Sequence, residues 1–361
     1  MFQLTQKGSP KEKGSIHGEQ FRNEIRELAA IRKELLFKYL PNHTQKEIEN
    51  LCEAHSHYMQ KNTPDLWEEF KAIADSSKTS QNDLMILNNY TDLRDFVESP
   101  KNESLDDGGC SCIYIQNAKG EIYGGQTWDM HASAEKFMLL MHDYDQHGNK
   151  SEILTVTGCL ALAGINSQKL GVFINNVHSK KAKVGLMWPA FVRKLLEHSS
   201  ISSVEEQFKD TPPSSAHSYL IISPEGARCF ECTGEKHEKI YQSKNESEEY
   251  FFHTNHFLGE IAADENIERQ SKTTHARYAS LENFFKKTPW KDWKMKEFMA
   301  EFLCGENCPK EIYIAPKANE PHGSSTCGGL FYPFSQNQPG VAYKGIYTTS
   351  QSLEIKPEKL L

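Results

Sequence analysis

The sequence predicts an α+β fold. The first hundred of its 361 residues have the spacing of amphipathic helices, whereas β-branched and aromatic runs dominate afterwards. These later runs follow one another as hairpins, and helical patterns fall in groups between them. Strict alternation of strand and helix, which marks a parallel doubly wound sheet, is not seen. A chain of this length is long enough to bury one large core or two modest ones.

Four helices are predicted before residue 100. The first covers 17–40, where apolar residues recur every three or four positions. The second begins after a capping box formed by Thr44 and Glu47, whose side chains can each accept a free backbone N–H at a helix start. The third begins at Pro64, since proline at the first helical position loses no hydrogen bond. Ser80 can cap the fourth.

After Pro100 the chain is predicted to be mostly strand, following a polar, acidic, exposed loop at 101–109. The predicted strands are 112–115, 137–142, 153–157, 171–175, 218–223, 227–233, 250–254, 330–334 and 341–348. Helical patterns interrupt them at 188–198, 202–208, 275–285 and 290–304.

The composition gives no sign of a nucleic-acid or membrane partner. The net charge is −8, and lysines and arginines are scattered along the chain. The N-terminus lacks a basic segment followed by an apolar core, and no apolar run approaches the roughly 20 residues of a membrane helix. We therefore expect a cytoplasmic protein in which most of the nine cysteines are free thiols.

One cysteine stands out by its position. Gly108 and Gly109 lead directly into Cys110, which opens an apolar, β-branched run, and a second glycine pair further on leads to Asp129. A thiol at the start of a strand with a carboxylate a hairpin away is compatible with a catalytic pair. Spacing alone favours a small buried hydrophobe, which is the usual role of a free cysteine.

Two cysteine pairs raise the alternative of a zinc-stabilised module. Cys229 and Cys232 form one pair, and Cys304 and Cys308 form the other. The separation between the pairs exceeds that of common zinc modules, and residues three apart in a strand face opposite sides. No HxxxH or HExxH spacing occurs among the histidines. We therefore expect no metal site and no cofactor.

The chain resembles the isopenicillin-N acyltransferase-like family, the cysteine N-terminal nucleophile hydrolases related to acyl-coenzyme A:6-aminopenicillanic acid acyltransferase. Gly8-Ser9-Pro10-Lys11-Glu12-Lys13-Gly14-Ser15-Ile16-His17-Gly18 is similar to the family signature G-x-P-x-x-x-G-x-x-H-G. The resemblance continues in order and spans nearly the whole chain. Its further blocks are Ile73-Ala74, Leu87-Asn88, Gly109-Cys110, Gly125-Gln126-Thr127-Trp128-Asp129, Gly164-Ile165-Asn166, Gly171-Val172-Phe173-Ile174-Asn175 and His253-Thr254-Asn255-His256-Phe257.

The resemblance implies a four-layer αββα sandwich and self-cleavage at the Gly109–Cys110 bond. Residues 1–109 would become a helical small chain that stays bound to the catalytic large chain 110–361, the two forming one compact domain. Cleavage frees the α-amino group of Cys110, whose reference pKa is about 8. That amine can then take the thiol proton, and the thiolate can form a thioester acyl-enzyme.

The resemblance also implies roles for residues beyond Gly109 and Cys110. Asp129 corresponds to the acid that orients the new amino terminus, and Asn255 to the amide that donates to the tetrahedral oxyanion. Taken alone, each residue is more typical of a turn. Asn175 lines the pocket or is a buried structural amide. Cys112 faces the same side of the strand as Cys110, so it belongs to the expected pocket as well.

Four positions depart from the family pattern. Thr127 stands where relatives usually have Asn, and Cys112 where they usually have a hydroxyl residue. Tyr90 stands where the penicillin enzyme has Arg, and the Asp expected before Pro333 is replaced by tyrosine. These changes put that enzyme's substrate in question more than its chemistry.

The predicted activity is hydrolysis of a linear, non-peptide amide, with a small-molecule amide as partner. The alternative within enzymes is acyl transfer from acyl-CoA to an amine, since both reactions use one acyl-enzyme and differ in the acceptor. A catalytically silent scaffold and a zinc-stabilised binding module are the alternatives from other classes.

Overall fold

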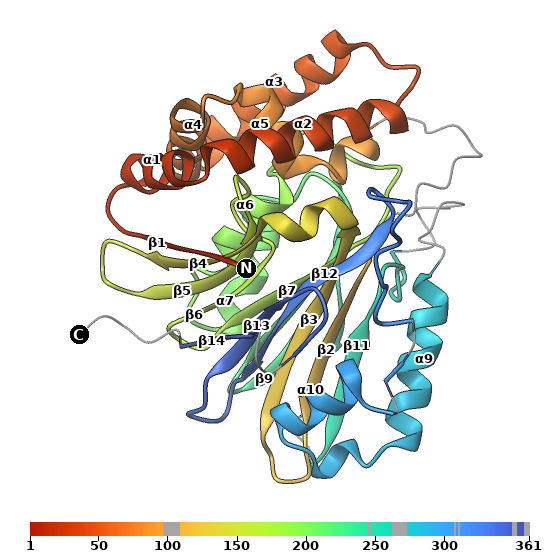
Figure 1. Cartoon of the computed structure of the whole chain (residues 1–361). Coiled ribbons are helices and arrows are strands. Elements are labelled where there is room, and N and C mark those ends of the chain that lie inside the picture. The colour runs from red at the N-terminus through yellow and green to blue at the C-terminus, as the bar shows by residue number, and fades with distance from the viewer. Residues whose placement is uncertain are drawn as a thin grey trace.

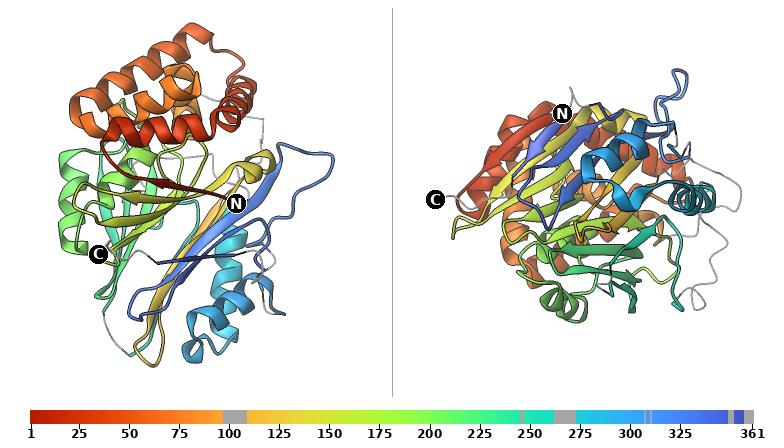
Figure 2. Two further views of the ribbon diagram at one scale, coloured as in Figure 1. Left: turned by 60° about the vertical axis from the view of Figure 1, so that its left-hand side comes forward. Right: turned by 90° about the horizontal axis from the view of Figure 1, so that it is seen from below.

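The computed structural model describes residues 1–96, 109–244, 247–261, 273–306, 308–309, 311–348 and 352–356. Two β-sheets lie face to face, with helices on both outer faces and a further helical layer across one end (Figures 1 and 2). The predicted α+β class with an αββα sandwich is therefore confirmed. The predicted acidic loop at 101–109 lies outside the described residues, apart from Gly109.

The helical layer at the end of the sandwich comes from the first part of the chain. It consists of α1 (Pro10–Gln20), α2 (Arg22–Tyr39), α3 (Gln45–Asn62), α4 (Pro64–Ser77), α5 (Gln81–Asn89) and the 3₁₀ turn η1 (Asp92–Arg94). The capping box at Thr44, the proline start at Pro64 and the cap at Ser80 are confirmed. The single helix predicted for 17–40 is wrong. The helix is interrupted at Phe21, which separates α1 from α2. The first of these, α1, begins before the predicted start at residue 17, because Ser9 and Glu12 form a second capping box.

The larger sheet has the strand order β1-β4-β5-β6-β7-β8-β9-β10. Its strands are β1 (Phe2–Gln6), β4 (Met138–Tyr144), β5 (Lys150–Val156), β6 (Ala163–Asn166), β7 (Gly171–Asn176), β8 (His217–Ser223), β9 (Gly226–Cys232) and β10 (His237–Gln242). All neighbours are antiparallel except β1, which pairs in parallel with β4. The first strand of the chain therefore joins the helical layer directly to the sandwich.

The smaller sheet has the order β11-β2-β3-β12-β13-β14. Its strands are β2 (Cys110–Gln116), β3 (Ile122–His131), β11 (Glu249–His253), β12 (Ser324–Pro333), β13 (Gly340–Lys344) and β14 (Leu353–Ile355). Side chains of β2 alternate: Cys110, Cys112 and Tyr114 enter the core between the sheets, whereas Ile113 and Ile115 enter the core under the outer helices.

Aromatic side chains attach the outer helices to the two sheets. On the larger sheet lie α6 (Trp188–Leu195) and α7 (Ile201–Asp210), where Phe191 and Phe208 contact Tyr219 of β8 with ring centroids 5.0 and 5.5 Å away. On the smaller sheet lie α9 (Thr274–Lys287), the 3₁₀ turn η3 (Trp290–Asp292) and α10 (Met295–Cys304). There Phe285 of α9 stacks on Tyr250 of β11 at 4.3 Å. The helix predicted over 290–304 is thus a 3₁₀ turn followed by a separate α-helix.

Buried ion pairs hold the helical layer on the larger sheet. Lys13 of α1 lies 2.7 Å from Asp143 of β4, and Arg193 of α6 lies 2.8 Å from Glu69 of α4. All four side chains are almost wholly buried, so these contacts are protected from screening by salt. Among the described residues, no helix combines the length and apolarity needed to cross a bilayer.

Candidate active site

The candidate nucleophile Cys110 begins β2, beside β3, where its backbone partner is Trp128. The residue before it is held tightly. The carbonyl oxygen of Gly109 accepts a hydrogen bond of 2.6 Å from the backbone N–H of Asp129. A Cβ at position 109 would lie 2.3 Å from Arg277 Nη2 and 2.9 Å from Asn255 Oδ1. Only glycine therefore fits before the nucleophile without displacing these two side chains.

Asn255 lies in the loop after β11, and its side-chain amide faces Cys110. Its Oδ1 accepts from the backbone N–H of Cys110 at 3.0 Å and from Arg277 Nη2 at 2.6 Å. Its Nδ2 donates to the carbonyl oxygen of Asn176 at 2.8 Å. Two donors on one side and an acceptor on the other fix the orientation of the amide. In this uncut chain the donor to the Gly109 carbonyl is Asp129 N–H, and an oxyanion role for Asn255 stays a prediction.

Arg277 is the site residue that the sequence analysis missed. It lies in the first turn of α9, is fully buried, and donates from Nη1 to the carbonyl oxygen of Cys110 at 2.8 Å and to Ser111 Oγ at 3.3 Å. A signal was present, because Arg277 precedes Leu281 and Phe284 by four and seven residues and so continues their buried stripe. An arginine in an apolar stripe must have polar partners in the interior.

Asp129 is buried next to the thiol and is held by Thr326, whose Oγ1 donates to Asp129 Oδ1 at 2.6 Å. Burial and then the negative charge of Asp129 raise the pKa of the Cys110 thiol to about 12, although the Arg277 guanidinium opposes both. The thiol is therefore neutral near pH 7 while its own nitrogen is locked in a peptide bond. A neutral thiol needs a base before it can attack.

Asn175 and Cys112 both lie close to the nucleophile. Asn175 Nδ2 donates to the carbonyl oxygen of Cys110 at 2.8 Å, so this amide positions the nucleophile directly. Cys112 is fully buried, and its Sγ lies 3.9 Å from Gln126 Oε1 of β3. Burial raises the pKa of Cys112 well above the usual thiol value. The structure thus brings five of the predicted residues together: Gly109, Cys110, Asp129, Asn175 and Asn255. Cys112 lies two residues further along β2, in the core.

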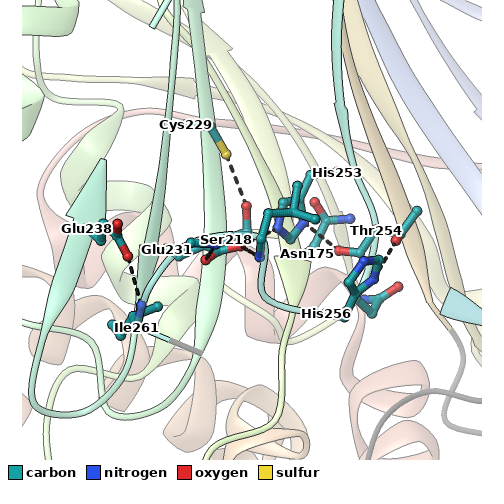
Figure 3. A network of polar contacts seen from close by, with 12 residues as sticks. Asn175, Ser218, Cys229, Glu231, Glu238, His253, Thr254, His256 and Ile261 are labelled. Carbon is teal, nitrogen blue, oxygen red and sulfur yellow. Dashed lines mark hydrogen bonds and ion pairs between the residues drawn. The ribbon is translucent and has the colours of Figure 1, made fainter. Parts of the chain in front are cut away.

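A buried carboxylate holds the loop that carries Asn255. Glu231 of β9 accepts from His253 Nε2 at 2.8 Å (Figure 3). It also accepts from the backbone N–H groups of Leu258 and Gly259 at 2.7 and 3.0 Å. From the other side, Thr274 Oγ1 at the start of α9 accepts from the backbone N–H of Asn255 at 2.7 Å. The loop is thus fixed to the larger sheet and to α9 at once.

The four cysteines of the zinc alternative do not converge. Cys229 Sγ lies 3.2 Å from Ser218 Oγ, whereas Cys232 Sγ lies 3.3 Å from the carbonyl oxygen of His217. Cys304 contacts the carbonyl oxygen of Tyr347. In the part of the chain that the structure describes, no three His, Cys, Asp or Glu side chains are grouped to hold a metal ion.

Comparison with known proteins agrees with the motifs. The family described as acyl-coenzyme A:6-aminopenicillanic acid acyl-transferase matches residues 116–307, a segment that contains Asp129, Asn255 and Arg277 and starts after Cys110. Among solved structures, the chain is similar to penicillin V acylase from Agrobacterium tumefaciens, with 11% identity and a TM-score of 0.40 over 65% of this chain and 82% of that chain. Since the family match covers more than half of its residues, the chain belongs to the acyl-coenzyme A:6-aminopenicillanic acid acyl-transferase family.

Proposed function

We propose that this protein is a cysteine N-terminal nucleophile amidohydrolase that cuts its own chain at Gly109–Cys110 and then hydrolyses linear, non-peptide amides. The observation that carries the proposal is the set of contacts around this one peptide bond. The Gly109 oxygen has a donor in Asp129 N–H, and the Cys110 nitrogen has an acceptor in Asn255 Oδ1. The Cys110 oxygen has two donors, from Asn175 and Arg277.

Self-cleavage begins with attack of Cys110 Sγ on the Gly109 carbonyl carbon. The carbonyl oxygen becomes an oxyanion that Asp129 N–H stabilises. The C–N bond then breaks, the nitrogen takes the proton of the thiol, and a thioester joins Gly109 to Sγ. Water hydrolyses this thioester, which leaves a carboxylate on Gly109 and a free α-amine on Cys110.

The amine created in this way supplies the base that the buried thiol lacks. It takes the thiol proton, the thiolate attacks the substrate amide, and the protonated amine of the substrate leaves. Water resolves the acyl-enzyme to a carboxylic acid. Asp129, beside Cys110, is placed to favour the protonated form of the new amino terminus through its charge.

The proposal includes retention of the small chain after cleavage, as one half of a heterodimer. Its first strand, β1, is paired within the larger sheet, and Asn88 of α5 exchanges hydrogen bonds with the backbone of Gly158 and Leu160. Together with the buried pairs of Lys13 and Arg193, these contacts do not depend on the continuity of the chain at Gly109.

Cleavage is tested by intact mass and amino-terminal sequencing of the purified protein. Two fragments that co-elute under native conditions, one of them starting at Cys110, are expected, and Cys110→Ala should stay uncut. A full-length chain with thiol-dependent activity would contradict the proposal.

The family match favours acyl-coenzyme A-dependent transfer to an amine as a second candidate. Assays with acyl-coenzyme A, with and without an amine acceptor, separate the two reactions. The hydrolase proposal expects release of free acid that added amine does not suppress.

A further inference from the structure

Gln126 connects the two sheets close to the nucleophile. It lies on β3, is fully buried, and pairs through its backbone with Cys112 of β2. Its side chain leaves the smaller sheet, and its Oε1 accepts a hydrogen bond of 2.7 Å from the backbone N–H of Ile174 on β7. A side chain of the smaller sheet therefore supplies the acceptor for a backbone group of the larger sheet.

This acceptor is needed because β7 extends beyond its neighbour β6. In these two strands, which the structure describes completely, pairing is confined to Gly171 and Val172 of β7. The strand β7 continues to Asn176 and pairs with β8 along its whole length. A buried backbone N–H without a partner is costly, so the contact with Gln126 fixes the position of β7 at Ile174.

The two residues after Ile174 hold the site. Asn175 Nδ2 donates to the carbonyl oxygen of Cys110 at 2.8 Å, and the carbonyl oxygen of Asn176 accepts from Asn255 Nδ2 at 2.8 Å. Because β2 is paired with β3, these contacts form a closed ring that runs from β3 to β7 and back through the nucleophile to β2. The ring fixes the end of β7 relative to Cys110.

The two ends of the Gln126 amide are used unequally. Oε1 accepts from Ile174, and the Cys112 thiol lies 3.9 Å from the same oxygen. Nε2 is buried and has no hydrogen-bond partner among the described residues. An unpaired donor in the core is costly, and an apolar side chain of the same length would fill the space without that cost. Packing alone therefore does not account for the amide, whereas its acceptor oxygen does.

We propose that Gln126 is a positioning residue, which holds β7 so that Asn175 keeps the Cys110 carbonyl group in the geometry that self-cleavage requires. This inference rests on the proposed function and adds to it a residue that acts through another side chain. The competing role is structural only, in which the contact stabilises the packing of the two sheets without acting on Cys110.

The test is the rate at which newly synthesised full-length chain is converted to fragments. Gln126→Met keeps the length of the side chain but lacks the acceptor, so it should slow cleavage roughly 10- to 100-fold, as small displacements of reacting groups do. Gln126→Glu should cleave at close to the wild-type rate, since a carboxyl group in this apolar interior stays protonated and its carbonyl oxygen can accept from Ile174. Gln126→Leu replaces Gln126→Met should the latter not fold.

Thr155→Val is the control for the loss of an interior hydrogen bond. Thr155 is buried on β5 and donates to the carbonyl oxygen of Cys159 at 3.0 Å. This variant should have a lower midpoint of denaturant unfolding and still cleave at the wild-type rate. If Thr155→Val slowed cleavage as much as Gln126→Met, cleavage would simply follow stability, and the proposal would be refuted.

A double-mutant cycle with Asn175→Ala tests the route of the effect. Asn175→Ala should itself slow cleavage, and adding Gln126→Met to it should slow cleavage no further, because Gln126 acts through Asn175. Rate losses that multiply in the double variant would overturn the proposal, as would cleavage of Gln126→Met at the wild-type rate. A wild-type chain that never cleaves would instead contradict the proposed function, and this inference would fall with it.

Discussion

Arg277 donates to the carbonyl oxygen of Cys110 from Nη1 at 2.8 Å, and its Nη2 donates to Asn255 Oδ1 at 2.6 Å. One buried guanidinium therefore ties the nucleophile's backbone to the loop that carries the amide. Three residues earlier on α9, Thr274 accepts from the backbone N–H of Asn255. The first turn of this helix thus sets the distance between Cys110 and Asn255, although α9 and β2 are far apart in the sequence.

Substitution of Arg277 should slow self-cleavage much more than it affects stability. Arg277→Met removes the positive charge that counters the high pKa of Cys110, so the pKa rises further and less thiolate forms at a given pH. The loss of charge-assisted hydrogen bonds is expected to slow cleavage by roughly 10- to 100-fold. Stability should change less, because Asn175 still donates to the Cys110 oxygen.

This prediction is checked by the rate at which full-length chain disappears on denaturing gels after synthesis. Arg277→Lys keeps the charge but not the fork of donors, so it should recover only part of the rate. Lys286→Met, at an exposed position of the same helix, is the control for loss of a positive charge. Cleavage of Arg277→Met at the wild-type rate would show that the guanidinium does not act on the thiol.

Glu231 is expected to act as a positioning residue for Asn255. Glu231→Ala leaves His253 and two backbone N–H groups without their acceptor, so it should lower the free energy of unfolding by roughly 1–3 kcal/mol. The variant should lower kcat more than it changes KM, because the loop that Glu231 holds carries Asn255 at the reacting centre. Glu231→Gln retains an acceptor and should restore most of the stability.

The matched comparison for Glu231 is Glu238→Gln on the neighbouring strand. Among the residues that the structure describes, Glu238 accepts from the N–H of Ile261 alone, and Ile261 lies farther along the loop from Asn255 than Leu258 and Gly259 do. Its substitution should leave kcat unchanged. An equal loss of kcat in both variants, measured on correctly cleaved protein, would mean that the loop responds to general destabilisation.

Asp92 should make stability depend on pH. Burial raises its pKa to about 8, and its carboxyl lies 2.5 Å from Ser214 Oγ and 3.3 Å from Nε2 of His217, whose pKa burial lowers to about 3. In the unfolded chain an aspartate titrates near 3.9. Between these values the folded state holds one proton more than the unfolded state, so stability is highest below about pH 4 and falls as pH rises toward about 8.

Denaturant unfolding from pH 5 to pH 8 measures this dependence, with Asp92→Asn as the comparison. The free energy of unfolding of wild type relative to the variant should fall by up to about 1.4 kcal/mol per pH unit and level off above pH 8. A constant difference across this range would show that Asp92 is already ionised in the folded protein. Asp95 lies nearby and contacts His178. The contribution of Asp92 is therefore taken from the difference between wild type and Asp92→Asn, and not from the wild-type pH dependence alone.

Local signals in the sequence predicted most of the fold, and the failures have identifiable causes. Caps and prolines located the helix starts, and β-branched runs located most buried strands. The strand β3 was missed because Gly124 and Gly125 read as a turn. Instead they allow close approach of neighbouring strands, since a Cβ at Gly125 would lie 2.1 Å from the Leu330 carbonyl oxygen. The polar strand β10 offers no buried pattern to detect.

The site residues that lie in ordered motifs could be predicted from the sequence. Those that only tertiary packing brings to the site could not. Cys110, Asp129 and Asn255 lie in motifs that can be read from the chain. The contact between Arg277 and Cys110 links residues 167 positions apart, and no spacing rule predicts it. The orientation of the Asn255 amide depends on three separate partners that are distant in the sequence, so no local pattern predicts it.

Asn255→Asp separates two roles that one amide can fill. In the uncut chain Oδ1 accepts from Cys110 N–H and Arg277, and an aspartate keeps both interactions. Self-cleavage should therefore proceed, since the donor to the Gly109 oxygen is Asp129 N–H. Turnover of a substrate amide should fall by roughly 100-fold or more if Nδ2 serves the oxyanion after cleavage, because a carboxylate cannot donate. Asn255→Ala, which removes both functions, should lose both activities. Normal turnover in the cleaved Asn255→Asp enzyme would assign the oxyanion to backbone donors alone and leave Asn255 as an acceptor for the amino terminus.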